Sequence, residues 1–168
     1  GLENVPFVCI KIPTGGGKTI VATHMLNSIY EKFAQPRNQT GLVLWLVPTT
    51  AIKTQTINAL KNRKHHYREV LDQKFSNNIL VMDTKQALSI KKHDIQDNLC
   101  IIVSTVSAFR INDKEGRKVY SENGSLLEHF EDLPDDLEKL LPKDADKQTT
   151  PSLMNVIKMS NPVVVADE

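Results

Sequence analysis

Seven consecutive residues near the start of the chain have the types that bind phosphate. They are Pro13, Thr14, Gly15, Gly16, Gly17, Lys18 and Thr19. The glycines allow backbone N–H groups to close around phosphate oxygens without interference from a Cβ atom. In such a loop the lysine reaches the β- and γ-phosphates, and the hydroxyl of the next residue ligates Mg²⁺. These residues therefore predict a site for ATP and Mg²⁺, with Lys18 in a catalytic role and Thr19 as a metal ligand.

The residues on both sides of the loop predict the strand and the helix that it needs. Residues 5–12 are an apolar, β-branched run, which indicates a buried strand. Apolar residues after the loop share one face of a helix: Ala22, Leu26, Ile29 and Phe33. The complete motif begins with a glycine, and Ile12 stands at that position, which argues against a nucleotide kinase or a small GTPase. The alternative, a glycine-rich turn with a chance Lys-Thr pair, is disfavoured by the flanking elements.

Two carboxylates follow the last apolar strand of the chain. Residues 162–166 predict that strand, and Asp167 and Glu168 come directly after it. Because the carboxyl ends of parallel strands share one edge of a sheet, both side chains are expected beside the phosphate loop. Asp167 would hold Mg²⁺ and Glu168 would polarise the attacking water. The alternative is an exposed, charged strand end, and the glycine loop favours the catalytic interpretation.

Strand and helix signals alternate, which predicts an α/β domain with a mostly parallel sheet and helices on its flanks. At least five strands are expected, at 5–12, 41–47, 78–82, 100–105 and 162–166. Helices are expected at 51–63, capped by Thr49 or Thr50, and at 151–159, capped by Thr150. Residues 110–150 hold eleven Asp or Glu against seven Lys or Arg, which predicts a solvated, partly helical insertion before the last strand.

The composition narrows the function less than the motifs do. The net charge of the 168 residues is +1, so any nucleic-acid binding must come from a local patch. A cluster of basic residues follows the second helix, and a solvated helix end is favoured there over a nucleic-acid track: Lys61, Arg63, Lys64, His65, His66 and Arg68. Cys9 and Cys100 are expected to be buried, reduced thiols. Without a signal peptide or a membrane-spanning run, a cytoplasmic location is expected.

Four segments together resemble the first RecA-like domain of superfamily 2 helicases. Residues 13–19 resemble motif I and residues 47–55 resemble motif Ia. Residues 103–109 look like motif Ib/Ic, and residues 165–168 look like the start of motif II, the DEAD/DEAH box. Within the superfamily, Pro-Thr-Gly-Gly-Gly-Lys-Thr and Thr-Val-Ser-Ala-Phe look most like the restriction-enzyme R-subunit group, which includes type III Res proteins. The resemblance covers nearly the whole chain except the insertion.

The resemblance implies a RecA-like P-loop ATPase that moves on or unwinds nucleic acid, with DNA favoured. It implies that Thr49 and Thr105 contact the phosphates of one strand. It also implies a second RecA-like domain in the same longer chain, and modification or specificity subunits as possible partners. Residues 1–168 are then expected to be one domain of a longer protein that is cut at motif II. Without the arginine finger of the second domain, this piece alone is expected to be inactive.

Three alternatives stay open at this point. An RNA helicase of the DEAD/DEAH type usually carries Ala-x-Thr-Gly-x-Gly-Lys-Thr and Pro-Thr-Arg-Glu-Leu, whereas the chain has Ile12-Pro13 and residues 48–52 read Pro-Thr-Thr-Ala-Ile. A P-loop phosphotransferase would need the first glycine and an arginine-rich lid, and neither is found. A nucleotide-binding regulatory module would bind ATP without turnover. The RNA helicase is a rival within the motors, and the other two are not motors. The test that separates these alternatives is ATPase activity of the full-length protein stimulated by nucleic acid.

Overall fold

Four parallel strands form one sheet in the order β2-β3-β1-β4. The computed structural model describes residues 5–13, 15–32, 40–110, 114–143 and 149–167. The strands are β1 (Gly41–Val47), β2 (Ile79–Asp83), β3 (Leu99–Thr105) and β4 (Val163–Ala166). Because all four are parallel, the residues that follow them lie along the same edge of the sheet.

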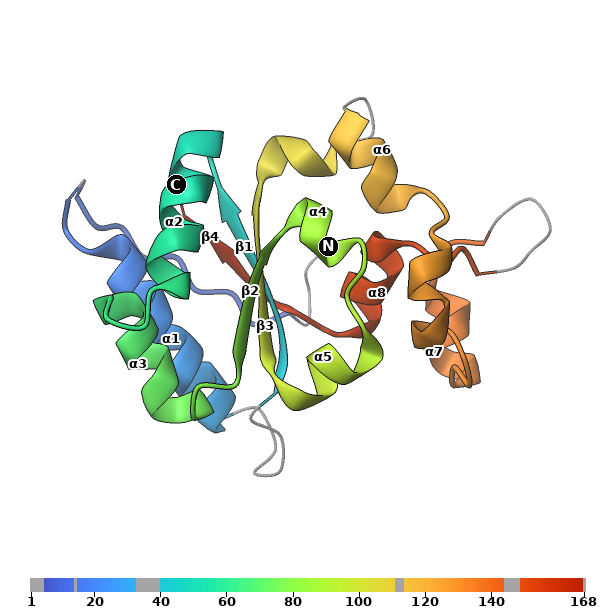
Figure 1. Cartoon of the computed structure of the whole chain (residues 1–168), viewed down its shortest axis with the longest axis horizontal. Helices are drawn as coiled ribbons and strands as arrows, with labels where there is room; N and C mark the ends of the chain where they lie inside the picture. Colours follow the sequence, from blue (N-terminus) through green and yellow to red (C-terminus); the bar gives the residue numbers. More distant parts are fainter. Residues whose placement is uncertain (1–4, 14, 33–39, 111–113, 144–148, 168) are drawn as a thin grey trace.

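Helices cover both faces of this sheet (Figure 1). One face carries α1 (Lys18–Lys32), α2 (Thr50–Lys61) and α3 (His66–Phe75). The other face carries α4 (Thr84–Ala87), α5 (Lys92–Asp97), α6 (Lys114–Tyr120) and α8 (Leu153–Met159). The remaining elements are α7 (Asp135–Leu140) and two 3₁₀ helices, η1 (Val106–Phe109) and η2 (Gly124–His129). The predicted α/β class, with a parallel sheet between helices, is confirmed.

The two central strands supply both hydrophobic cores. In β1, Val43 and Trp45 face the α1–α3 side, whereas Leu42 and Leu44 face the other side. This alternation follows from the two-residue period of a strand. All seven residues of β3 are buried, as expected of a strand that is covered on both faces. The continuous apolar runs seen in the sequence therefore correspond to the centre of the sheet.

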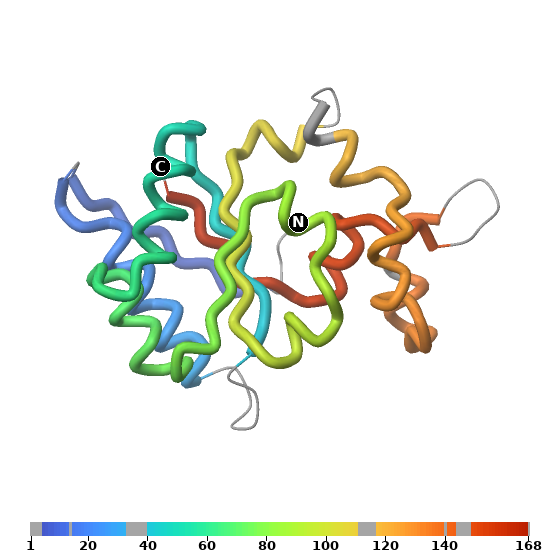
Figure 2. Tube along the Cα trace, viewed as in Figure 1, coloured from blue at the N-terminus to red at the C-terminus, as the bar shows by residue number. Residues whose placement is uncertain are grey.

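The predicted first strand, residues 5–12, is wrong. The structure gives this segment no regular hydrogen-bonded pairing, and its apolar side chains are exposed, with Phe7 at 78%. Figure 2 shows it as the dark blue tube that leads to the loop before α1. A strand exists only where its backbone pairs with a neighbour. Among the described strands β4 pairs with β1 alone, so its outer side was open to a neighbour, yet residues 5–12 do not pair with it. Cys9 lies in this segment and is exposed, whereas Cys100 in β3 is buried as predicted.

The helices predicted at 51–63 and 151–159 are present as α2 and α8, with shifted ends. Thr49 caps α2 as predicted, since its side chain accepts a hydrogen bond from the Ile52 N–H at 3.3 Å. In contrast, α8 is capped by Ser152 rather than Thr150, so it begins two residues later than expected. The described part of the insertion is helical, but it is less solvated than predicted. Its Val119 and Leu126 are fully buried and complete the second core.

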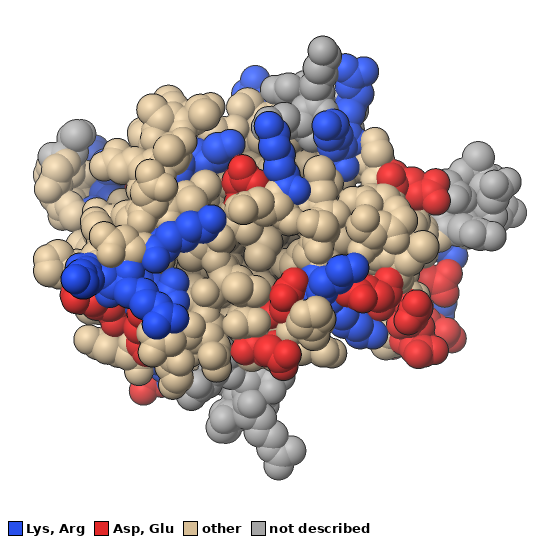
Figure 3. Space-filling view, viewed as in Figure 1, with Lys and Arg blue, Asp and Glu red and all other residues tan. Residues whose placement is uncertain are grey.

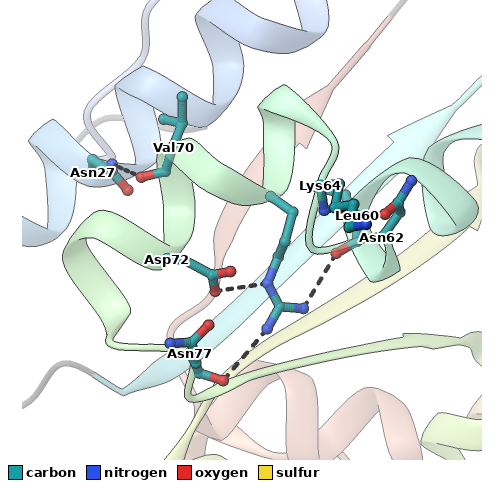
Figure 4. A network of polar contacts seen from close by, with 8 residues as sticks. Asn27, Leu60, Asn62, Lys64, Val70, Asp72 and Asn77 are labelled. Carbon is teal, nitrogen blue, oxygen red and sulfur yellow. Dashed lines mark hydrogen bonds and ion pairs between the residues drawn. The ribbon is translucent and has the colours of Figure 1, made fainter.

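Arg68 is a structural residue and does not belong to a surface cluster. Its side chain is buried at 5% exposure, and its Nε donates to Asp72 Oδ1 at 2.7 Å. The guanidinium also donates to the carbonyl oxygens of Leu60, at 3.3 Å, and Asn77, at 3.4 Å (Figure 4). Arg68 thus joins the end of α2, the helix α3 and the turn before β2. The sequence placed Arg68 with exposed basic residues because it shows charge but not burial.

Replacing Arg68 by Met is expected to lower the free energy of unfolding by about 3 kcal/mol. The change leaves the carboxylate of Asp72 and two carbonyl groups without their buried donor, and breaking a buried pair is strongly destabilising. Urea unfolding followed by circular dichroism measures this loss. Arg63→Met, which removes the same charge from an exposed position, is the control and should stay within about 0.5 kcal/mol. Equal losses in the two variants would contradict the structural role of Arg68.

Candidate active site

The glycine segment forms a tight loop directly before α1. Gly15 and Gly17 have φ of 80° and 83°, in the left-handed region that favours glycine. The Gly16 N–H donates to the Pro13 carbonyl at 2.9 Å, and a Cβ atom on Gly16 would lie 2.5 Å from Ile12 Cγ2. The loop therefore requires glycine at these positions. Thr14, the other predicted loop residue, lies outside the described residues.

The structure brings Thr19 and Asp167 into contact, although 148 residues separate them in sequence. Thr19 Oγ1, in the first turn of α1, donates to Asp167 Oδ2 at 3.1 Å. The Asp167 backbone is held in turn, since its N–H donates to the Leu46 carbonyl at 2.8 Å. This bond continues the parallel pairing of β4 with β1, in which Ala166 lies opposite Leu46. Glu168 lies outside the described residues.

This arrangement has the chemistry that a nucleoside triphosphate with Mg²⁺ requires. A threonine hydroxyl and an aspartate carboxylate are hard oxygen ligands of the kind that Mg²⁺ prefers. Lys18 is half-exposed at the start of α1, and the first turn of this helix holds no acidic residue. The positive end of the helix dipole therefore faces the loop, and no side chain of the first turn of α1 itself offsets it with a negative charge. The described residues contain no group of three His, Cys, Asp or Glu that could hold a metal by itself.

The two predicted nucleic-acid contacts differ in accessibility. Thr49 is exposed at the N-terminus of α2. Thr105 is only 7% exposed, and its Oγ1 lies 3.0 Å from Ser107 Oγ, within hydrogen-bond distance. Ser107 is exposed, so it is the hydroxyl presented to solvent at the end of β3. Sequence reasoning missed Ser107, although it stands within the same Thr-Val-Ser segment that pointed to Thr105.

The strand order fixes the sequence of these groups along the carboxyl edge. Asp167 follows β4, Thr49 follows β1 and Ser107 follows β3, and these strands are consecutive neighbours in the sheet. The end of β2 is attached to the same edge, since Thr84 Oγ1 lies 2.8 Å from Ser104 Oγ in a buried hydrogen bond. One edge of the sheet thus holds the phosphate loop, the carboxylate and the exposed hydroxyls in a row.

The buried thiol of the domain does not contribute a nucleophile. Burial, together with the nearby Asp94 carboxylate, raises the pKa of Cys100 to about 12. The Cys100 thiol also donates to the Asp94 carbonyl oxygen at 3.3 Å. Cys100 therefore stays protonated at neutral pH, and the thiolate that would react is not formed.

A parallel sheet with a glycine loop and a strand-end aspartate at its carboxyl edge defines a P-loop nucleotide-binding domain of the α/β class. Residues 3–168 match the family model described as "Type III restriction enzyme, res subunit". The chain belongs to this family, and the domain is a first RecA-like domain of helicase superfamily 2. Neither a curated protein nor a solved structure gives a significant match to the chain.

Membership of this family implies a helicase-like, ATP-dependent nucleic-acid motor domain. Proteins of this kind generally use ATP and Mg²⁺. Within the described ranges, none of the helices has the length and apolarity that a membrane crossing requires.

Replacing Gly17 by Ala is expected to weaken ATP binding by about 5- to 30-fold. An L-residue in the left-handed region costs about 1–2 kcal/mol, and the new Cβ would lie 3.1 Å from Ile20 Cγ2. Titration with a fluorescent ATP analogue measures the change. Gly124→Ala is the matched control, because its Cβ would meet nothing within 4 Å and its φ is not positive. If Gly17→Ala bound ATP as tightly as Gly124→Ala, the loop geometry would not govern nucleotide binding.

Proposed function

We propose that this domain hydrolyses ATP and that the intact protein couples hydrolysis to movement along DNA. The observation that carries the proposal is the contact between Thr19 and Asp167. This contact joins α1, the helix after the glycine loop, to the residue that follows β4. Family membership supports the same conclusion at the level of an ATP-dependent motor domain.

Each residue around the loop would have its own role in binding ATP. The backbone N–H groups of Gly15, Gly16 and Gly17 would hold phosphate oxygens, and the Lys18 ammonium would neutralise charge on the β- and γ-phosphates. Thr19 and Asp167 would hold Mg²⁺, which when bound supplies further charge neutralisation. Pro13 and Thr14 would complete the loop.

Glu168 would act as the base that orients and polarises the attacking water. Its place in the chain, directly after Asp167, supports this role, because the backbone of Asp167 is tied to Leu46. Turnover would also need an arginine from a second RecA-like domain, which stabilises charge in the transition state. We therefore propose such a domain as the partner of this one in the intact protein.

Nucleic acid would run along the carboxyl edge past Thr49 and Ser107. The exposed N-terminus of α2 at Thr49 offers backbone N–H groups and a positive dipole to a phosphate. Ser107 would donate to a phosphate, and Thr105 would act by holding Ser107 in place. Such contacts are independent of base sequence and weaken with salt. DNA is favoured over RNA because residues 12–13 and 48–52 depart from the RNA-helicase pattern.

Replacing Lys18 by Ala is expected to abolish ATP turnover. Glu168→Gln is expected to keep ATP binding but to lower kcat by about 10²–10⁴-fold, because only the base function is lost. The intact protein, with DNA present, is tested by a coupled ATPase assay and by nucleotide titration. Lys32→Ala, which removes an exposed lysine from the last turn of the same helix, should keep wild-type activity. A near wild-type rate for either Lys18→Ala or Glu168→Gln would refute the assigned roles.

Replacing Thr49 by Asp is expected to weaken nucleic-acid binding at least tenfold without lowering stability. Aspartate caps a helix as well as threonine does, so α2 should be retained, while its charge repels phosphate. Fluorescence anisotropy with labelled single-stranded DNA at several salt concentrations measures the affinity. Ser125→Asp adds the same charge to an exposed position in η2 and should have little effect. An unchanged affinity in Thr49→Asp would exclude Thr49 from the track.

The choice between DNA and RNA, and the coupling to movement, need a separate experiment. The ATPase rate of the intact protein is compared with double-stranded DNA, single-stranded DNA and RNA of equal length. Displacement of a third strand from a DNA triplex reports translocation. Stimulation by RNA alone would favour an RNA helicase, and turnover that ignores nucleic acid would favour a phosphotransferase.

A further inference from the structure

A groove of about 250 Å³ lies between α5, α8 and the segment that joins η2 to α7. Its lining is mainly apolar and comes from all three elements: Ile95, Leu133, Pro134, Leu137, Val156 and Met159. The groove is smaller than the ~300–1,000 Å³ of typical small-molecule sites. An individual apolar side chain of a docked peptide therefore fits it better than a cofactor does.

The groove lies toward the edge of the sheet opposite the ATP site. Helix α5 ends at Asp97, just before β3 begins at Leu99, and Met159 lies just before β4 begins at Val163. The helices α5 and α8 therefore end near the edge where the strands begin, whereas Thr19 and Asp167 meet at the edge where the strands end. The seven residues of β3 span roughly 23 Å. A ligand in the groove would not compete with ATP for the same space.

The segment beside the groove is strongly acidic. Residues 128–138 hold six carboxylates and no lysine or arginine. Two of the six carboxylates have partners within the domain. Glu128 accepts a hydrogen bond from the Lys92 backbone N–H at 2.7 Å, which lowers the pKa of this carboxyl, and Glu138 forms an ion pair with Lys143. No ion pair joins the other four to any residue that the structure describes: Glu131, Asp132, Asp135 and Asp136.

Two of these free carboxylates, Glu131 and Asp132, line the groove itself, and Asp135 and Asp136 are exposed in the first turn of α7. Lys92 and His129 are the basic side chains of the lining. Figure 3 shows acidic side chains on the right-hand side of the molecule, where α7 lies, with some Lys or Arg side chains among them. This charge repels a phosphate backbone and attracts a basic chain.

We propose that the groove binds a segment of a partner protein in which an apolar anchor side chain is flanked by lysine or arginine. The apolar lining buries the anchor, and the carboxylates at its rim pair with the basic flanks. Nucleic acid satisfies neither requirement. The surface would let the insertion recruit a protein while the opposite edge of the sheet stays open to ATP and nucleic acid.

Three labelled twelve-residue peptides test the proposal by fluorescence anisotropy with the intact protein. The first carries a central Leu flanked by lysines, the second replaces Leu by Ser, and the third replaces the lysines by Glu. The first peptide is expected to bind at least tenfold more tightly than either of the others. If the Ser peptide bound equally well, simple charge attraction would explain the binding and the groove would have no part in it.

Two double variants with the same change of charge test whether the Leu peptide binds at the groove. Asp135→Lys with Asp136→Lys is expected to weaken binding of the Leu peptide at least tenfold. Glu31→Lys with Glu69→Lys alters exposed carboxylates on α1 and α3 and should weaken it less than threefold. Equal effects of the two pairs would overturn the proposal.

Discussion

The hydrogen bond between Thr19 and Asp167 depends on nearly every other feature of the domain. It closes a contact over 148 residues, so it forms only when α1 and β4 are both placed by the sheet. The position of Asp167 is set by its backbone bond to Leu46 and by the pairing of β4 with β1. The position of β1 is set by β3, which is buried along its whole length. The candidate active site is therefore a consequence of parallel strand order.

The buried strands could be predicted from the sequence because a parallel strand covered on both faces is a continuous apolar run. Residues 41–47 and 99–105 have this pattern, and both form central strands. Residues 5–12 have the same pattern, yet they form no strand. Propensity describes what a segment can do, whereas a strand exists only beside a hydrogen-bonding neighbour. Pairing is a property of the folded sheet, where β4 keeps an outer side that residues 5–12 do not pair with, and an apolar run in the sequence does not show it.

The residue types of the candidate site could be predicted from the sequence, but not which of their side chains are exposed. The glycine loop and Asp167 were found by motif because their chemistry is local and their spacing is strict. Arg68 was grouped with exposed basic residues because burial is decided by how neighbouring elements pack, which a sequence pattern does not show. Arg68 is enclosed between α2, α3 and the turn before β2, and Thr105, at the end of β3, is buried with its hydroxyl within hydrogen-bond distance of Ser107. A hydroxyl or a guanidinium looks the same in sequence whether it faces solvent or satisfies a buried carbonyl.

The domain has two separate surfaces, the ATP site where the strands end and the groove beside α7 toward the edge where they begin. The carboxyl edge is built from strand ends, where each residue is fixed by ladder bonds, so this edge suits chemistry that depends on small distances. The insertion is attached to the second face by Val119 and Leu126, and its acidic helix α7 lies away from the sheet (Figure 1). Asp135 and Asp136 in the first turn of α7 are exposed and take no part in the core. The exposed face of α7 is therefore free to differ in charge without moving Thr19 or Asp167, which is the freedom that a recognition surface requires.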